Sequence, residues 1–179
     1  MATVIYVGRA ERLLAIRVTG DGAWREAQAL DAWAKGAIKE DTAGLVVDLS
    51  DSHQLDSTFV GTFVGLARLL QQRQLGEVAI YGVDENVRAN LEELGVPLVI
   101  SEIRADRLPH DVAWEVLPIG EPEPGALAKH VLAAHELLME IEGANIPRFE
   151  ESVSMLRASF SGASTESAGD QEKGKKSRG

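Results

Sequence analysis

The sequence lacks cysteine entirely among its 179 residues. This excludes a disulfide framework and any thiol chemistry, and it fits a reducing compartment. Long apolar runs are also missing, since no stretch approaches the roughly 18 residues of a membrane span. The first residues, Met1 to Tyr6, have neither the basic region nor the long apolar region of a secretory signal. We therefore expect a cytoplasmic protein without direct membrane insertion.

Motifs of enzymes and of cofactor or metal sites are missing as well. Ser57 does not lie in a Gly-x-Ser-x-Gly nucleophile elbow. Gly20-Asp21-Gly22 lacks the third glycine of a dinucleotide loop, and no glycine run is followed by a Walker lysine. His130 and His135 are five residues apart in a predicted helix, so they point to different faces and make a poor metal pair. We therefore expect no enzyme, no cofactor and no metal.

The charge balance is strongly acidic, with a formal net charge of −10. An acidic surface repels phosphate backbones and anionic lipid headgroups, so we expect no nucleic-acid partner. It does favour basic patches on protein partners. The hydrophobic share of 45% is ordinary for a globular protein, and the length suits one domain with an appendage.

Short apolar and β-branched runs alternate along the chain with stretches of helical period. The predicted strands are 3–7, 13–19, 45–49, 78–81 and 98–100, with an edge strand at 114–118. The predicted helices among them are 23–39, 59–70 and 85–94. The run from Leu45 to Leu49 lacks the alternation of an exposed sheet, which is typical of a buried parallel strand. We predict an α/β fold with a mixed sheet of four to six strands covered by helices.

The C-terminal third predicts a helical appendage. A Glu-Pro-Glu-Pro-Gly linker is followed by predicted helices at 126–142 and 148–160, which form an αα-hairpin. The hairpin is expected to pack on the domain or on a partner, and it is a candidate homodimer contact. Residues from Ser161 onward have no apolar period and predict disorder. The expected organisation is a domain at 1–120, a hairpin extension at 121–160 and a disordered tail at 161–179.

One loop concentrates the polar residues that carry chemistry. Asp56, Ser57 and Thr58 lie between a buried strand and a strongly periodic helix, at the N-terminus of that helix. Ser57 or Asp56 can act as the N-cap, which is worth about 1 kcal/mol. Ser57 can also accept a phosphate, which would add a charge of about −1.5 to −2. The helix dipole tolerates that anion, whereas a docked partner with an apolar or acidic surface does not.

The order of these motifs resembles the STAS family. Val46-Val47-Asp48-Leu49, then Leu55-Asp56-Ser57-Thr58, then Gly61 and an apolar helix are similar to the core of bacterial anti-sigma-factor antagonists, the anti-anti-sigma factors. Gly20-Asp21 resembles the family's Gly-Glu turn, and 84–97 resembles its next helix and turn. The resemblance covers about residues 3–118. It implies a non-catalytic switch in signal transduction and transcription regulation.

The resemblance also implies partners and site residues. Ser57 matches the phosphoacceptor of the family. A serine kinase of the anti-sigma type, or another signalling protein, would bind here, and a phosphatase would reset the switch. The partner-binding residues carried over by position are Asp21, Asp56, Ser57, Thr58, Phe59 and Val60.

Two departures accompany the resemblance, and one alternative function stays open. Phe59-Val60-Gly61 stands where the family has Gly-Leu-Gly, and Ala23 stands where it has an acidic residue. The alternative is a constitutive STAS scaffold, for example an accessory subunit of a membrane transporter complex. In that case Ser57 is only a helix cap.

Overall fold

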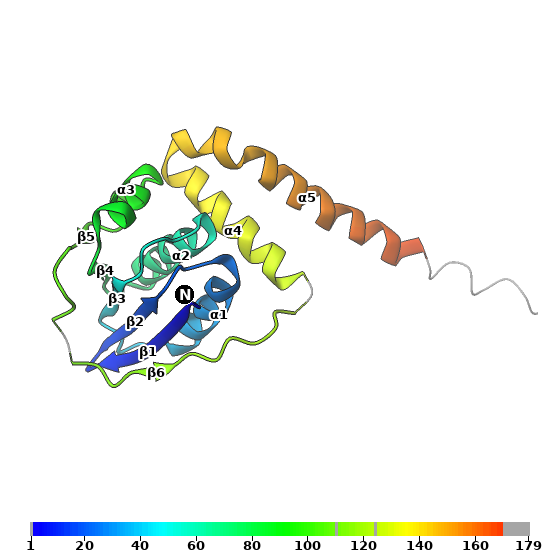
Figure 1. Cartoon of the computed structure of the whole chain (residues 1–179). Coiled ribbons are helices and arrows are strands. Elements are labelled where there is room, and N and C mark those ends of the chain that lie inside the picture. Colours follow the sequence, from blue (N-terminus) through cyan, green and yellow to red (C-terminus); the bar gives the residue numbers. More distant parts are fainter. Residues whose placement is uncertain (1, 110, 124, 170–179) are drawn as a thin grey trace, which may run out of the picture.

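The sheet is six-stranded and mixed, with strand order β5-β4-β3-β2-β1-β6 (Figure 1). The structure is a computed structural model that describes residues 2–109, 111–123 and 125–169. β1 pairs antiparallel with β2 and β6, whereas β2, β3, β4 and β5 run parallel. The strands are β1 Val4–Ala10, β2 Leu13–Thr19, β3 Gly44–Asp51, β4 Glu77–Tyr81, β5 Glu102–Ile103 and β6 Glu115–Val116.

Helices connect the parallel strands, as the alternation of apolar runs and helical periods predicts. The predicted fold class is confirmed: an α/β mixed sheet, covered by helices, with two C-terminal helices that contact each other. The helices are α1 Trp24–Ala37, α2 Ser57–Arg73, α3 Glu85–Glu93, α4 Ala126–Ile141 and α5 Ile146–Gly169, with short 3₁₀ turns η1 Val96–Leu98 and η2 Gly143–Asn145.

The main core lies between one face of the sheet and the helices. Alternate residues of the central strands, such as Leu14, Ile16 and Val47, are buried there against Phe59 and Phe63 of α2. The opposite face carries a smaller cluster, in which Leu108, Val112 and Trp114 pack on Ala15, Val46, Ala79 and Tyr81. Both faces of β3 are therefore buried, as the continuous apolar run predicts for a central parallel strand.

One predicted strand is wrong. Three apolar residues at 98–100 predict a strand, but the 3₁₀ turn η1 ends at Leu98, residues 99 and 100 are in no strand, and the strand that pairs with β4 is β5 at Glu102–Ile103. Gly95 has φ +77°, and Pro97 follows within the turn, where it has no N–H to give to a ladder. The apolar side chain of Ile100 is buried in the core even though it lies outside a strand.

The last helix is longer than predicted. The apolar period predicts a helix that ends at Phe160 and a disordered tail from Ser161, but the backbone of α5 continues to Gly169. No proline interrupts this segment, and extending an existing helix adds one hydrogen bond for each residue fixed. The remainder of the predicted tail, 170–179, lies outside the described residues.

The hairpin lies on the body of the domain. In Figure 1, α4 crosses over α2, and α5 turns back beside α4 and extends past it. The contacts between α2 and α4 are close because α2 carries glycine at Gly61. Among the helices in the described part of the chain, none is long and apolar enough to cross a bilayer.

Candidate functional site at the start of the second helix

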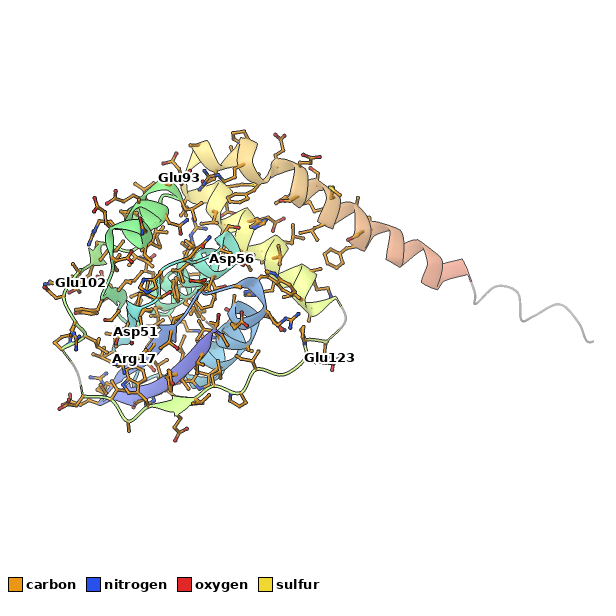
Figure 2. The ribbon with its side chains drawn as sticks, viewed as in Figure 1. Arg17, Asp51, Asp56, Glu93, Glu102 and Glu123 are labelled. Carbon is orange, nitrogen blue, oxygen red and sulfur yellow. The ribbon has the colours of Figure 1, made fainter. Side chains whose placement is uncertain are left out.

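Asp56 joins the beginnings of two helices. Its Oδ1 accepts a hydrogen bond from the backbone N–H of Phe59 at 2.8 Å, so it is the N-cap of α2. Its Oδ2 accepts a hydrogen bond from the backbone N–H of Trp24 at 2.6 Å, in the first turn of α1. Asp56 is labelled in Figure 2 near the start of α2. The cap role therefore belongs to Asp56, and the Ser57 hydroxyl is available for another contact.

The Gly20-Asp21-Gly22 turn is bonded to the same loop. The Gly22 N–H donates to the Gln54 carbonyl, and the Asp56 N–H donates to the Gly22 carbonyl, both at 2.9 Å. A Cβ on Gly22 would lie 2.7 Å from a methyl carbon of Leu55 and 3.1 Å from ring carbons of Phe59, so glycine allows this close approach without displacing either side chain. The structure thus brings the exposed Asp21 to the loop of Asp56, two predicted site residues that are 35 positions apart.

Ser57, the first residue of α2, contacts a histidine of the C-terminal hairpin. Its Oγ lies 2.9 Å from Nε2 of His135. The hydroxyl of Ser152 donates to the Phe149 carbonyl, so its oxygen can only accept from His135 Nδ1, at 3.3 Å. We infer that His135 carries its proton on Nδ1. Its Nε2 then accepts the Ser57 proton.

The His135 ring is held neutral in an apolar setting. It is buried between α2 and α5, and it stacks on Phe149 with ring centroids 4.5 Å apart. Burial lowers the pKa of His135 below its ordinary value, and the nearby Asp56 carboxylate only partly offsets this. A neutral imidazole is the form that can accept the proton of Ser57.

A second pair of hydroxyl and imidazole groups lies further along α2. Thr62 Oγ1 donates to the Thr58 carbonyl at 2.8 Å, and it lies 2.9 Å from Nε2 of His130. The other ring nitrogen of His130 is 3.7 Å from the Asp31 carboxylate of α1. Burial lowers the pKa of His130, while Asp31 acts in the opposite direction. Through these contacts, His130 joins α4 to α2 at Thr62 and to α1 at Asp31.

The two histidines are site residues whose contacts with α2 the sequence did not predict. It separated His130 and His135 by their helical angle, but both reach hydroxyl groups of α2 because α4 lies across that helix. The only sequence signal was the presence of two imidazoles in a largely apolar helix. Within the described residues, no group of three or more His, Cys, Asp or Glu side chains could hold a metal ion.

The expected partner-binding residues differ in accessibility. Asp21 is exposed, and Asp56 and Ser57 are partly exposed. Thr58, Phe59 and Val60 are buried, with Phe59 and Val60 fully inside the core. In this structure, Thr58, Phe59 and Val60 support the loop from the core side and offer no accessible surface to a partner.

Asp48 of β3 is held by hydrogen bonds from its own strand and from β2. Its Oδ1 accepts from the N–H and the hydroxyl of Ser50, at 3.0 and 2.6 Å, and its Oδ2 accepts from Nε of Arg17 at 2.8 Å. Burial alone raises the pKa of Asp48, but these hydrogen bonds outweigh it and lower the pKa below its ordinary value. Asp48 therefore stays ionised and ties the end of β3 to β2.

The chain is similar to known proteins in family and in fold. A family model described as "Mlab, STAS domain" matches residues 6–99. No curated protein matches the chain. The NMR structure of the protein TM1081 is 15% identical, with a TM-score of 0.50 over 56% of this chain and 79% of that chain. A sulfate transporter family protein from Wolinella succinogenes is 11% identical, with a TM-score of 0.48 over 53% of this chain and 78% of that chain. At such identities the first likeness shows the fold alone.

Proposed function

The chain belongs to the STAS domain family, and on that premise we propose that it is a phosphorylation-controlled protein-interaction switch similar to an anti-sigma-factor antagonist. STAS domains are generally non-catalytic, and we propose that this one is not an enzyme. Its partner would be a serine kinase of the anti-sigma type or another signalling protein, and a phosphatase would reset it. We place this activity in the cytoplasm, with transcription as the process regulated.

The observation that carries the proposal is the position of Ser57. It is the first residue of α2, it is partly exposed, and its hydroxyl is not used as the cap because Asp56 takes that role. A phosphate on Ser57 would lie at the positive end of the helix dipole, which stabilises it locally. The exposed Asp21 lies on the neighbouring turn, so a new phosphate would make this surface strongly acidic. A partner that matches the unmodified surface would then lose complementarity.

The accessible part of the proposed partner surface is Asp21, Asp56 and Ser57. Thr58, Phe59 and Val60, which the family resemblance includes, would act by holding the start of α2 in place. The net charge of −10 favours a partner with a basic docking surface. The proposal includes no nucleic acid and no cofactor.

The proposal is tested by partner exchange in native cells. Tagged protein carrying Ser57→Asp or Ser57→Ala is purified, and the co-purifying proteins are quantified by mass spectrometry. We expect one protein to bind Ser57→Ala and to fall at least about tenfold with Ser57→Asp, which corresponds to about 1.4 kcal/mol of binding energy. Ser154→Asp, on an exposed position of α5, adds the same charge elsewhere and should retain that protein. Equal recovery with all three variants contradicts the proposal.

A constitutive STAS scaffold, such as an accessory subunit of a transporter complex, is the second candidate function. The observation that favours it is the hydrogen bond between Ser57 and His135, which gives the hydroxyl a structural role within the fold. Under this alternative, Ser57 carries no phosphate in cells, and Ser57→Ala loses one hydrogen bond without changing any partner.

A further inference from the structure

A cavity lies where α1, α2 and α4 meet (Figure 1). Its volume is about 280 Å³, close to the lower end of the range of ligand pockets, so it suits a small molecule. The polar residues that line it include Asp31 and Lys35 of α1, Thr62 and Arg68 of α2, and His130 of α4. Polar groups from three helices therefore converge on one space.

Small residues shape the wall of this cavity between α2 and α4. At Gly61 the two helices touch, since an added Cβ would lie 2.7 Å from both the Cβ and the carbonyl oxygen of Ala134. One turn further along, a Cβ on Gly65 would meet only a methyl carbon of Leu137, at 3.2 Å. All four residues line the cavity, which therefore has an apolar wall beside its polar groups.

His130 has an acceptor that no donor of the described chain satisfies. Thr62 Oγ1 gives its only proton to the Thr58 carbonyl, so this oxygen can only accept from His130 Nε2, at 2.9 Å. Burial lowers the pKa of His130, so the ring is neutral at pH 7.5 and its Nδ1 carries a lone pair. The group that faces Nδ1, Oδ2 of Asp31 at 3.7 Å, is also an acceptor. A donor placed between these two atoms would satisfy both of them.

Two cations of the lining supply the opposite kind of group. Lys35 Nζ donates to Asp31 at 2.7 Å, and Arg68 Nη1 donates to Glu140 at 2.5 Å. Both cations are partly exposed, and ion pairs of this kind contribute little to stability, so an anion can compete for them. The Arg68 guanidinium is a planar fork of five N–H donors, and within the described residues only Nη1 has an acceptor. Its other donors are available to an anion.

The geometry points to a binding site for a small hydroxylated anion, such as a sugar phosphate or a sugar acid. A ligand hydroxyl donates between His130 Nδ1 and the Asp31 carboxylate, and the anionic group accepts from Arg68 and Lys35. The Thr62 level and the Arg68 level of α2 are about 9 Å apart along the helix axis, so several bonds separate the two ligand groups. This site involves neither Ser57 nor its loop and does not depend on the proposed function.

Nitrogen–proton correlation NMR of the full-length protein at pH 7.5 tests the site by titration. The probes are ribose 5-phosphate and, separately, gluconate. We expect at least one of them to shift the amide signals of Thr62, Gly65 and Ala133, with a Kd of about 1 mM or tighter. Ribose lacks the anion and inorganic phosphate lacks the hydroxyls of the sugar, so each should bind at least about tenfold more weakly than ribose 5-phosphate. The tighter of the two probes shows whether the site takes a phosphate or a carboxylate.

Substitutions in the cavity test the roles of the two ends. Arg68→Met keeps the side-chain stem without the guanidinium and should weaken binding at least about tenfold. Arg73→Met is the matched control, because Arg73 is exposed on the same helix and does not line the cavity. His130→Phe keeps a ring without an acceptor and should remove the preference for ribose 5-phosphate over inorganic phosphate. If His130→Phe does not fold, the comparison of Arg68→Met with Arg73→Met still decides.

Three results would overturn the site. The first is the absence of any shift with either probe at concentrations about tenfold above the expected Kd, or shifts that lie outside α1, α2 and α4. The second is inorganic phosphate that binds as tightly as ribose 5-phosphate, which leaves no role for the acceptors of His130 and Asp31. The third is equal affinity of Arg68→Met and Arg73→Met, which contradicts the position of the anion. None of these results bears on phosphorylation of Ser57.

Discussion

Two neighbouring residues have different structural roles at the start of α2. Asp56 accepts backbone hydrogen bonds from two helices, and Ser57 donates to a histidine 78 positions away. The sequence predicted the polar loop and the helix start from local spacing. It could not predict His135 as a partner of Ser57, because that contact exists only once α4 lies on α2.

The double role of Asp56 leads to a stability prediction. Asp56→Ala leaves two backbone N–H groups without their acceptor, and we expect it to destabilise the fold by about 2–3 kcal/mol. Asp84→Ala is the matched variant, since Asp84 caps a single helix, α3, where it accepts from the Val87 N–H at 2.8 Å, and its loss should be about 1 kcal/mol. Urea unfolding measures both. A smaller loss for Asp56→Ala than for Asp84→Ala would contradict the double role.

At the scale of elements, the sequence predicted most helices and strands but not how they pack. Continuous apolar runs and helical periods identified β3, β4 and α2. The error at 98–100 arose because three apolar residues satisfy a strand pattern and a buried turn equally well, and only pairing with β4 distinguishes them. The hairpin was predicted as an element, whereas its docking on α2 depends on Gly61, which local spacing does not reveal.

Two glycine variants test that packing. Gly36 lies in α1 with open space around it, so Gly36→Ala should stabilise the protein by about 0.5–1 kcal/mol. Gly61→Ala has the same intrinsic preference for helix, but it forces α2 and α4 apart, and we expect a net loss of about 1–3 kcal/mol. Denaturant midpoints compare them. Equal effects of the two substitutions would show that the α2–α4 contact is loose.

At the scale of the whole molecule, buried ionisable groups couple stability to pH. His130 and His135 have pKa values lowered by burial in the folded state, with Asp31, Asp56 and Lys35 as the charges that face them. The unfolded chain therefore binds more protons than the folded one. The contribution of the two histidines to the stability of the fold is complete above pH 6.5 and is lost as pH falls below it. Asp48 also has a lowered pKa, and its contribution is lost only below its ordinary value of 3.8.

Thermal unfolding across pH tests this coupling. We expect the melting temperature to fall between about pH 7.5 and pH 5.5, and to fall again in the acid region near pH 3. The double variant His130→Gln, His135→Gln should flatten the upper step and leave the acid step in place. A melting temperature that stays constant between pH 7.5 and pH 5.5 would contradict the assignment of neutral, buried imidazoles.

The modification state of Ser57 in native cells is the measurement closest to the central claim. The protein is purified during growth and under stress, and the peptide that contains Ser57 is quantified with and without phosphate by mass spectrometry. The account predicts phosphate on Ser57 whose occupancy changes with condition. A well-covered peptide that is unmodified under every condition would contradict the switch and would favour the constitutive scaffold.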